Sequence, residues 1–257
     1  MKKIIKKIIG LLGYKLVTNH KTYDMDYEED FIKEFESLEP YTVTSIERMY
    51  ALKQSVQYIV DNQIDGDFIE CGVWKGGSCM MIANTLLMND QQNRELWLYD
   101  TFDGMTMPTD EDIERETGNK VEDLMKSSKK NTDKYNIWAY APEDLVRKNM
   151  ESTGYPSTSV HYIKGKVEET LVETKPESIA LLRLDTDWYE STKIELNELY
   201  PLINDGGILI IDDYGHFEGA RKAVDEYFKF IKEKPLMHRI DPTGRLIIKK
   251  NKSDKKI

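Results

Sequence analysis

Four aspartates stand directly after two apolar runs in the second half of the chain. Asp185 and Asp187 follow the run IALLRL, and Asp212 and Asp213 follow the run GILII. Any one of these acids could be a helix cap or a solvated loop acid. Four at two strand ends favour a cation between them, because hard oxygen ligands select Mg²⁺, Ca²⁺ or Mn²⁺. We predict that Asp185, Asp212 and Asp213 ligate one divalent cation, and that Asp187 faces the same pocket as a candidate general base.

A glycine-rich turn, ECGVWKGGS, begins at Glu70 and joins an apolar run to a helical pattern. Glycine lets a backbone turn tightly and approach a ligand closely. The glycine spacing departs from GxGxxG, and the P-loop pattern is absent, so the turn alone is compatible with NAD, with S-adenosylmethionine (SAM) or with packing only. Asp100 ends the next apolar run, where an acid can accept both ribose hydroxyls or cap a turn. Together they favour a nucleoside, and a sulfonium cation suits Glu70 better than a pyrophosphate does.

The elements that must position these residues alternate between short apolar runs and helical patterns, which is typical of a parallel α/β sheet. We expect strands at 67–71, 96–99, 160–163, 179–184 and 207–211, helices at 78–88, 142–150, 190–199 and 219–232, and a closing antiparallel hairpin from 236–240 and 245–249. Ligands in such open sheets bind at the carboxyl ends of the strands. The acids and the glycine turn should therefore meet at one edge.

A chain of 257 residues with 40% hydrophobic residues fits one catalytic domain with an extension. We place a helical N-terminal extension at 1–62, which would cover the cofactor, shape the acceptor pocket or contact a second subunit. The catalytic domain is expected at 63–250 and a frayed tail at 251–257. The charged run TDEDIERE, residues 109–116, is expected to be a solvated, mobile loop.

The charge and the cysteines limit the classes of function. A net charge of −10 disfavours binding to a nucleic-acid backbone, so no nucleic acid is expected as a partner. Cys71 and Cys79 are the only cysteines, too few for a disulfide framework and badly spaced for zinc. Two reduced thiols agree with a cytoplasmic protein.

Residues 1–17, MKKIIKKIIGLLGYKLV, carry isoleucines and leucines along one helical face and lysines elsewhere. The apolar part is too short to span a bilayer, and we do not expect a signal peptide because no small-residue cleavage site is evident. Two hypotheses remain. The segment docks on the core or on a second subunit of a homodimer, or it lies on a membrane surface as a basic amphipathic helix.

The runs LLRLDTDWYEST, GGILIIDDYGHFEGARKAVDEYF, DFIECGVWKGGS and LYDTFDGM resemble the motifs of the macrocin O-methyltransferase (TylF-like) family, from about Ser45 to about Phe228. Residues 1–40 match nothing in that pattern. The resemblance implies a Rossmann-like class I SAM methyltransferase fold with a mostly parallel seven-stranded sheet. It also implies that SAM and Mg²⁺ are used to methylate a hydroxyl of a sugar or of an aromatic small molecule.

The resemblance also assigns roles to individual residues. It implies metal ligation by Asp185, Asp212 and Asp213, and Asp187 as the base. For the cofactor it implies the following residues: Glu70, Gly72 and Ser78 in the SAM loop, Asp100 on the ribose, and Arg48 and Met49 in a segment that covers SAM.

Two alternatives come from other classes of protein. A DxD motif at a strand end also occurs in metal-dependent sugar-nucleotide glycosyltransferases, although such an enzyme gives no account of the Glu70 turn and Asp100. A non-catalytic SAM- or metal-binding protein would need the same turn but would have no use for Asp187. An aspartate-nucleophile phosphohydrolase is disfavoured, because its DxD would end the first strand rather than the fourth.

Overall fold

The computed structural model describes residue 23, residues 26–130 and residues 136–250. The amphipathic segment 1–17 and the tail 251–257 lie outside the described residues. The chain forms two compact units, 1–36 and 37–257. Helix α3 (Ile46–Asp61) thus belongs to the same unit as the sheet, whereas the sequence analysis grouped it with the extension.

The first unit contains most of helix α2 (Glu29–Leu38). Its aromatic side chains lie against one another, since the Phe31 ring centroid is 5.4 Å from that of Tyr27 and 6.3 Å from that of Phe35. The Tyr23 hydroxyl donates a hydrogen bond of 3.0 Å to Glu36. The described part of this unit is therefore one amphipathic helix with an aromatic stripe.

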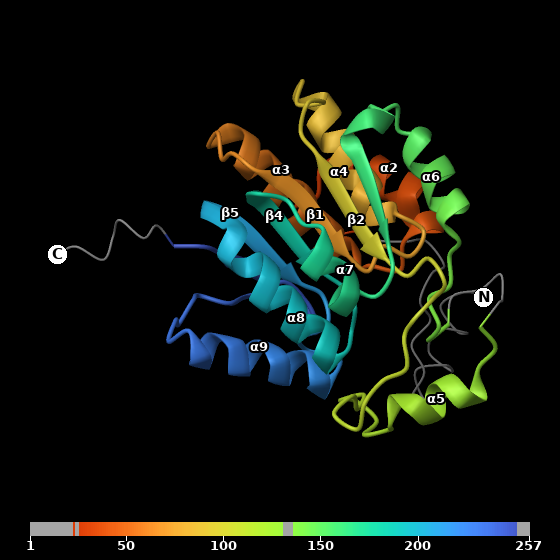
Figure 1. Cartoon of the computed structure of the whole chain (residues 1–257). Helices are drawn as coiled ribbons and strands as arrows, with labels where there is room; N and C mark the ends of the chain where they lie inside the picture. Colours follow the sequence, from red (N-terminus) through yellow and green to blue (C-terminus); the bar gives the residue numbers. More distant parts are fainter. Residues whose placement is uncertain (1–22, 24–25, 131–135, 251–257) are drawn as a thin grey trace, which may run out of the picture. The chain divides into compact units, whose positions relative to one another are not determined.

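The second unit is built on a seven-stranded sheet with the order β3-β2-β1-β4-β5-β7-β6 (Figure 1). The first five strands in this order are parallel to one another. β7 is antiparallel to both of its neighbours, β5 and β6. Their bounds are β1 (Asp67–Cys71), β2 (Leu96–Asp100), β3 (Val160–Lys164), β4 (Ile179–Leu184), β5 (Ile203–Ile211), β6 (His238–Arg239) and β7 (Arg245–Ile248). The mostly parallel seven-stranded sheet with a C-terminal antiparallel pair confirms the predicted fold class.

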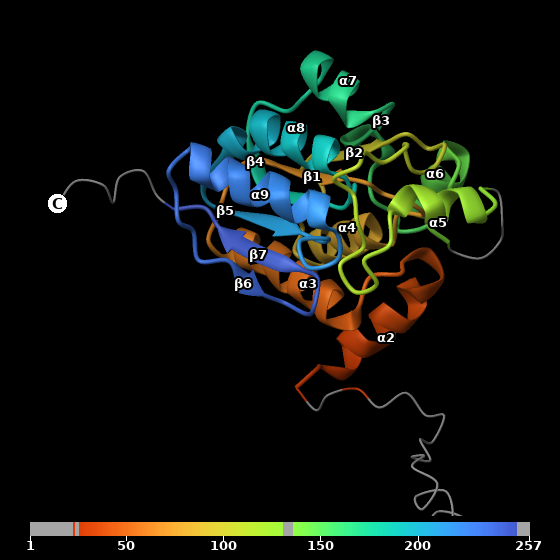
Figure 2. The same ribbon diagram turned by 90° about the horizontal axis from the view of Figure 1, so that it is seen from below.

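Helices cover both faces of the sheet (Figure 2). On one face lie α7 (Val167–Glu173), α8 (Tyr189–Leu199) and α9 (Glu218–Phe230). On the other lie α3 and α4 (Gly77–Met88), with α6 (Glu143–Glu151) packed beside α4. A further short helix, α5 (Val121–Ser127), lies in the connection between β2 and α6. None of the described helices is long and apolar enough to cross a membrane.

The apolar runs become buried strands because helices cover both of their faces. All six residues of β4 are buried, and the hydrophobic core around it takes side chains from β1, β5, α8 and α9. β5 begins four residues earlier than expected, at Ile203. Its register with β4 shifts between Ile203 and Ile208, and Gly206 in this irregular stretch has a positive φ of 82°. Helices α5 and α7 were not expected from the sequence. Each has seven residues and buries only two of them, Val121 and Met125 in α5 and Val167 and Leu171 in α7.

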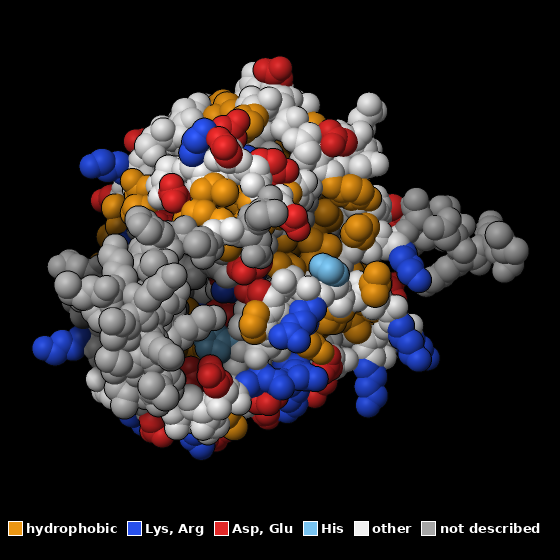
Figure 3. Space-filling model, turned by 180° about the vertical axis from the view of Figure 1, so that it is seen from behind, with side chains coloured by type: hydrophobic (Ala, Val, Ile, Leu, Met, Phe, Trp, Pro, Cys, Tyr) orange, Lys and Arg blue, Asp and Glu red, His pale blue; other side chains and the backbone are white. Residues whose placement is uncertain are grey.

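Charged side chains of both signs occur on the face of the molecule that is shown in Figure 3. Figure 3 shows acidic, basic and hydrophobic side chains interspersed over the face that it presents. The lack of a nucleic-acid partner remains a prediction, based on the net charge of −10.

Candidate active site

The acidic motifs and the glycine turn meet in one cavity at the carboxyl ends of the strands. The turn after β1 contributes Gly72 and Trp74, and β2 contributes Asp100 at its end. Among the residues expected at the site, seven line this cavity: Arg48, Gly72, Asp100, Asp185, Asp187, Asp212 and Asp213. The other three, Met49, Glu70 and Ser78, are buried at 0%, 1% and 4% exposure and are not part of its lining.

Three carboxylates converge closely enough to hold one metal ion. Asp185, Asp187 and Asp213 each present an oxygen, and these oxygens lie within 4.8 Å of one another. Among the described residues, Asp213 Oδ2 has no hydrogen-bond partner although it is buried. A buried carboxylate oxygen without a partner requires an explanation, and an ion is one of the few available. The set that converges thus shares Asp185 and Asp213 with the expected ligands, and contains Asp187 where Asp212 was expected.

The pKa values in this cluster follow from burial and from crowding of negative charge. Burial raises the pKa of Asp185 well above its usual range, because Arg183 only partly opposes it and Asp212 and Asp213 add repulsion. Burial also raises the pKa of Asp187, and Asp213 and Asp185 raise it further. Burial and mutual repulsion therefore both disfavour the ionised forms of Asp185 and Asp187, and a bound cation would oppose both effects.

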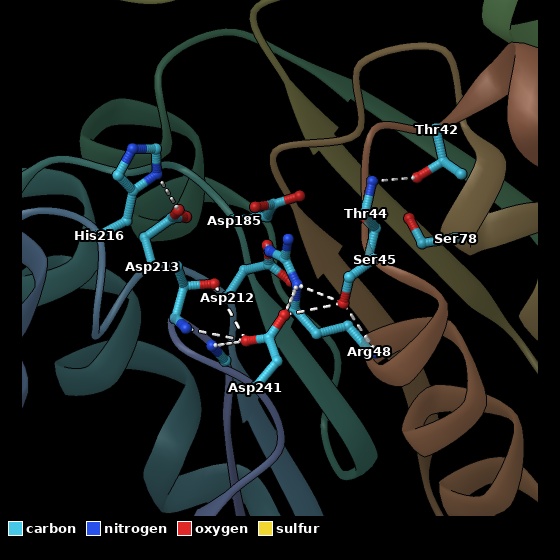
Figure 4. A network of polar contacts seen from close by, with 12 residues as sticks. Thr42, Thr44, Ser45, Arg48, Ser78, Asp185, Asp212, Asp213, His216 and Asp241 are labelled. Atoms are coloured by element: carbon cyan, nitrogen blue, oxygen red, sulfur yellow. Dashed lines mark hydrogen bonds and ion pairs between the residues drawn. The ribbon is translucent and has the colours of Figure 1, made fainter. Parts of the chain in front are cut away.

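Asp213 differs from its neighbours because a histidine faces it (Figure 4). His216 Nδ1 lies 3.7 Å from Asp213 Oδ1, and His216 Nε2 lies 3.5 Å from Glu114. Burial would raise the pKa of Asp213, but the contacts with His216 and Asp187 outweigh it and lower the pKa. The contact with Asp213 raises the pKa of His216 against the effect of burial, and Glu114 adds to the rise.

Asp212 is held by two arginines instead of joining the cluster. Arg183 Nη2 donates a hydrogen bond of 2.6 Å to Asp212 Oδ1, and Arg48 Nη1 contacts Asp212 Oδ2. Arg48 also pairs with Asp241 at 2.9 Å, and Asp241 accepts a hydrogen bond of 2.8 Å from Ser45 (Figure 4). These contacts tie the start of α3 to the turn between β6 and β7. Sequence reasoning missed Arg183, although an arginine within the apolar run IALLRL was a visible signal.

Asp100 holds the glycine turn after β1, which is called the cofactor turn below, by hydrogen bonds to its backbone. Its Oδ2 accepts hydrogen bonds from the backbone N–H groups of Val73, at 2.7 Å, and Trp74, at 3.1 Å. Its Oδ1 accepts one from Phe102 N–H at 2.7 Å. Burial raises the pKa of Asp100, and these three backbone donors oppose the rise. Asp100 therefore connects the turn after β1 with the loop after β2.

The backbone at Asp187 is unusual for a non-glycine residue. Asp187 has a φ of +70°, in the left-handed region. Trp188 N–H reaches back to the Thr186 carbonyl at 2.9 Å, and the Thr186 hydroxyl donates a hydrogen bond of 2.8 Å to Glu195. Glu195 is fully buried, and burial raises its pKa well above the usual range. These contacts hold the turn that aims Asp187 into the cavity.

The segment 101–120 is anchored beside the cavity. Residues 109–116 form a loop, as expected, but Asp112 within this loop is buried rather than solvated. Asp112 is 1% exposed and accepts hydrogen bonds from Thr109 N–H, at 2.7 Å, and from Tyr189 N–H, at 2.8 Å. Trp188 Nε1–H donates to the Thr106 carbonyl at 3.0 Å. Because Tyr189 begins α8, Asp112 caps that helix while it holds the segment.

Comparison with known proteins identifies the family of the chain. The family model described as macrocin-O-methyltransferase (TylF) matches residues 24–249. The demethyldecarbamoylnovobiocin O-methyltransferase of Streptomyces niveus is 32% identical over 187 residues, which cover 73% of this chain and 67% of that protein. The 8-demethyl-8-(2,3-dimethoxy-alpha-L-rhamnosyl)-tetracenomycin-C 4'-O-methyltransferase of Streptomyces olivaceus is 30% identical, with 73% and 67% covered.

Among solved structures, the O-methyltransferase NovP aligns with a TM-score of 0.71 and 28% sequence identity. The alignment covers 82% of this chain and 83% of NovP. The similarity in fold therefore extends over most of both chains.

Proposed function

The chain belongs to the macrocin-O-methyltransferase (TylF) family and is a SAM-dependent O-methyltransferase; from this we propose that it methylates a sugar hydroxyl of a glycosylated natural product with the help of a divalent cation. The sugar acceptor is supported by the relative named for a rhamnosyl-bearing substrate. The cation is supported by the chemistry of the acidic cluster in this chain.

The observation that carries the proposal is the convergence of the Asp185, Asp187 and Asp213 carboxylates, together with the buried, unpartnered Oδ2 of Asp213. All the donors are hard oxygens, which fit Mg²⁺ or Mn²⁺ better than a softer metal. When bound, such a cation would polarise the acceptor hydroxyl and lower its pKa. Neutral alcohols are poor nucleophiles at neutral pH, so this is the chemistry that the reaction needs.

We assign Asp185 and Asp213 as ligands, with Asp212 completing the set. Asp212 would have to give up its ion pair with Arg48 to do so. Arg48 has a second partner in Asp241, at 2.9 Å, and would therefore keep a counter-ion after the exchange. The ligand set proposed from the sequence thus requires the rearrangement of one side chain.

Asp187 is assigned as the proton acceptor. It lies in the same cluster as Asp185 and Asp213, and its turn is held by the contact between Thr186 and Glu195. Its pKa is raised by burial and by its acidic neighbours, and a bound cation would counteract that repulsion. A carboxylate at this position can accept the hydroxyl proton as the methyl group is transferred.

The methyl donor would occupy the half of the cavity next to Gly72, Trp74 and Asp100. Gly72 allows close backbone approach, and its φ of 84° is one that L side chains rarely adopt. The ribose hydroxyls of SAM would donate to the Asp100 carboxylate in addition to its backbone donors. Methyl transfer then depends on holding the acceptor oxygen in line with the methyl group.

The proposal is tested by measuring methyl transfer from SAM to a matched panel of deoxysugar glycosides and catechols, with mass spectrometry as the readout. We expect transfer to at least one glycoside, loss of transfer with EDTA, and recovery with Mg²⁺. Transfer to catechols alone would replace the sugar acceptor by an aromatic one. SAM binding without transfer to any hydroxyl would favour a non-catalytic SAM-binding protein, and binding of a sugar nucleotide in place of SAM would favour a glycosyltransferase.

The remaining expectations concern partners and location. A homodimer, attachment of residues 1–17 to a membrane surface, and a cytoplasmic location all stay predictions. Size-exclusion chromatography with light scattering would test the first, and vesicle co-sedimentation of the full chain against a chain lacking residues 1–17 would test the second.

A further inference from the structure

Arg183 is a charged side chain near the carboxyl end of a buried strand, β4. It is the one charged residue of β4, and its side chain is 2% exposed. Taking a guanidinium out of water is costly unless anions and hydrogen-bond acceptors surround it. An arginine in this position therefore indicates a specific set of partners.

Those partners are three carboxylates from three neighbouring strands. Arg183 Nη1 donates to Asp185 Oδ2 at 2.7 Å and contacts Glu70 Oε1. Arg183 Nη2 donates to Asp212 Oδ1 at 2.6 Å and to the Thr44 hydroxyl at 3.1 Å. Burial alone would lower the pKa of Arg183, but the three carboxylates hold the pKa above its usual value.

The sheet geometry explains why these groups meet. Glu70 on β1 is the registered neighbour of Arg183 on β4, so both side chains leave the sheet on the same face. Asp185 lies two residues beyond Arg183 and shares that face. The sheet therefore brings Arg183 into contact with the carboxylates at the strand ends.

Its contacts select one oxygen of each of two proposed metal ligands. Asp185 uses Oδ2 for Arg183, and Asp212 uses Oδ1. The other oxygen of Asp212 contacts Arg48, a residue that lines the cavity. A guanidinium is a planar, rigid fork of donors, so it fixes where the carboxylates point as well as neutralising them.

Glu70, which contacts Arg183, is itself held by hydrogen bonds from two residues of α4. Glu70 accepts hydrogen bonds from the Ser78 hydroxyl and, at 2.8 Å, from the Cys79 thiol. Ser78 and Cys79 lie in the first turn of α4, directly after the glycine turn. Glu70, Ser78 and Cys79 are buried and lie outside the cavity lining.

We infer that Arg183 is a positioning residue for a small divalent cation: it fixes the carboxylate of Asp185, and it holds Oδ1 of Asp212 so that Oδ2 is left for the cation once Arg48 releases it. The inference rests on the cation site of the proposed function. Mg²⁺ demands near-octahedral coordination at short distances, whereas Ca²⁺ tolerates longer and more variable coordination. A loosened carboxylate frame should therefore weaken Mg²⁺ binding more than Ca²⁺ binding.

The test is Arg183→Lys, which keeps the charge and removes the fork. Electron paramagnetic resonance of free Mn²⁺ gives the Mn²⁺ affinity of the full chain, and displacement by Mg²⁺ and by Ca²⁺ gives theirs. We expect the Mg²⁺ affinity to fall about tenfold, the lower end for loss of a group that orients metal ligands. The Ca²⁺ affinity should fall less than about threefold, because Ca²⁺ tolerates the altered geometry.

The matched control is Arg94→Lys. Arg94 also uses its fork in hydrogen bonds, but these go to the backbone carbonyls of Ile64 and Gly66, away from the cavity. This variant should leave both affinities unchanged. If Arg183→Lys does not fold, as judged by circular dichroism, Glu70→Gln replaces it, because that change weakens the contact between Glu70 and Arg183 without altering a residue of the cavity lining.

The outcomes separate the inference from the function on which it rests. Wild-type protein that binds no Mn²⁺ contradicts the proposed cation site itself. Wild-type protein that binds Mn²⁺, together with a folded Arg183→Lys or Glu70→Gln variant with an unchanged ratio of Mg²⁺ to Ca²⁺ affinity, contradicts only the positioning role. A selective loss of Mg²⁺ affinity supports both.

Discussion

Gly72 lies against the backbone of Asp185 so closely that a Cβ on Gly72 would be 2.0 Å from the Asp185 carbonyl oxygen. The two residues belong to different motifs, the cofactor turn after β1 and the acidic turn after β4. Asp185 N–H also donates a hydrogen bond of 2.8 Å to the Cys71 carbonyl. The glycine turn, where we propose that SAM binds, and the acidic turn after β4 are therefore held together by direct backbone contact.

Gly72→Ala should destabilise the protein and weaken SAM binding. The substitution combines a left-handed φ of 84° with a backbone clash, and the conformational part alone costs about 1–2 kcal/mol. Urea unfolding measures the loss of unfolding free energy. Gly118→Ala is the control, because Gly118 has a φ of 72° but nothing within 4 Å of the added Cβ. Equal losses in the two variants would show that the contact with Asp185 is unimportant.

Asp112→Ala should detach the segment 101–120, which contributes Met105 and Thr106 to the cavity lining, where we propose that the acceptor binds. Asp112 is buried and accepts from Thr109 and from Tyr189 at the start of α8, so its loss should cost about 1–3 kcal/mol of stability. We expect the KM for the acceptor to rise more than the KM for SAM in steady-state kinetics. Asp110→Ala, at an exposed ion pair with Lys120, should change neither, and an equal rise in both KM values for Asp112→Ala would contradict the assignment.

Stability without divalent cations should fall as the pH rises. The pKa values of Asp185 and Asp187 are raised on folding, so the folded state holds more protons than the unfolded state above the ordinary carboxyl range. His216, whose pKa is also raised, acts in the same direction. The stability from such groups is lost as the pH passes through their folded pKa values.

We therefore expect a higher melting temperature near about pH 6 than near about pH 8 in EDTA, and a larger increase on addition of Mg²⁺ at the higher pH. Differential scanning fluorimetry measures both. Asp187→Asn should flatten the dependence, since it removes one of the groups with a raised pKa. If the melting temperature of Asp187→Asn depends on pH as strongly as that of the wild type, groups other than Asp187 cause the dependence.

Asp187→Asn also distinguishes a base from a metal ligand. Asparagine tolerates the left-handed backbone that Asp187 adopts at φ +70°, so the turn should persist. As a general base, Asp187 should account for roughly 100-fold or more in kcat, with Mg²⁺ affinity retained. A large loss of Mg²⁺ affinity would instead make Asp187 a ligand, as its place among the three converging carboxylates allows.

The sequence was sufficient for features that depend on local pattern. The apolar runs predicted the five parallel strands. The acids at the strand ends were predicted to lie together, because the carboxyl ends of parallel strands meet at one edge of the sheet. It was insufficient for pairings between distant residues. Arg48 lies 164 positions before Asp212, and no local pattern links the two.

Burial of single polar residues was equally hidden. Asp112 stands in a charged run and is nevertheless buried, because its partner Tyr189 is 77 positions later in the chain. Glu70 is of a residue type that often contacts a ligand. In the structure it is buried in an ion pair with Arg183, its registered neighbour on β4. Such outcomes are decided by which strands become neighbours.

The most direct test of a metal-dependent methyltransferase is the rate of methyl transfer as a function of free Mg²⁺ after removal of divalent cations, for wild type, Asp212→Asn and Asp213→Asn. We predict no turnover without Mg²⁺, saturable recovery in wild type and little recovery in either variant. SAM affinity should stay within about 1 kcal/mol of wild type in the variants, because the cofactor turn is intact. Full activity of wild type in the absence of divalent cations would contradict the account.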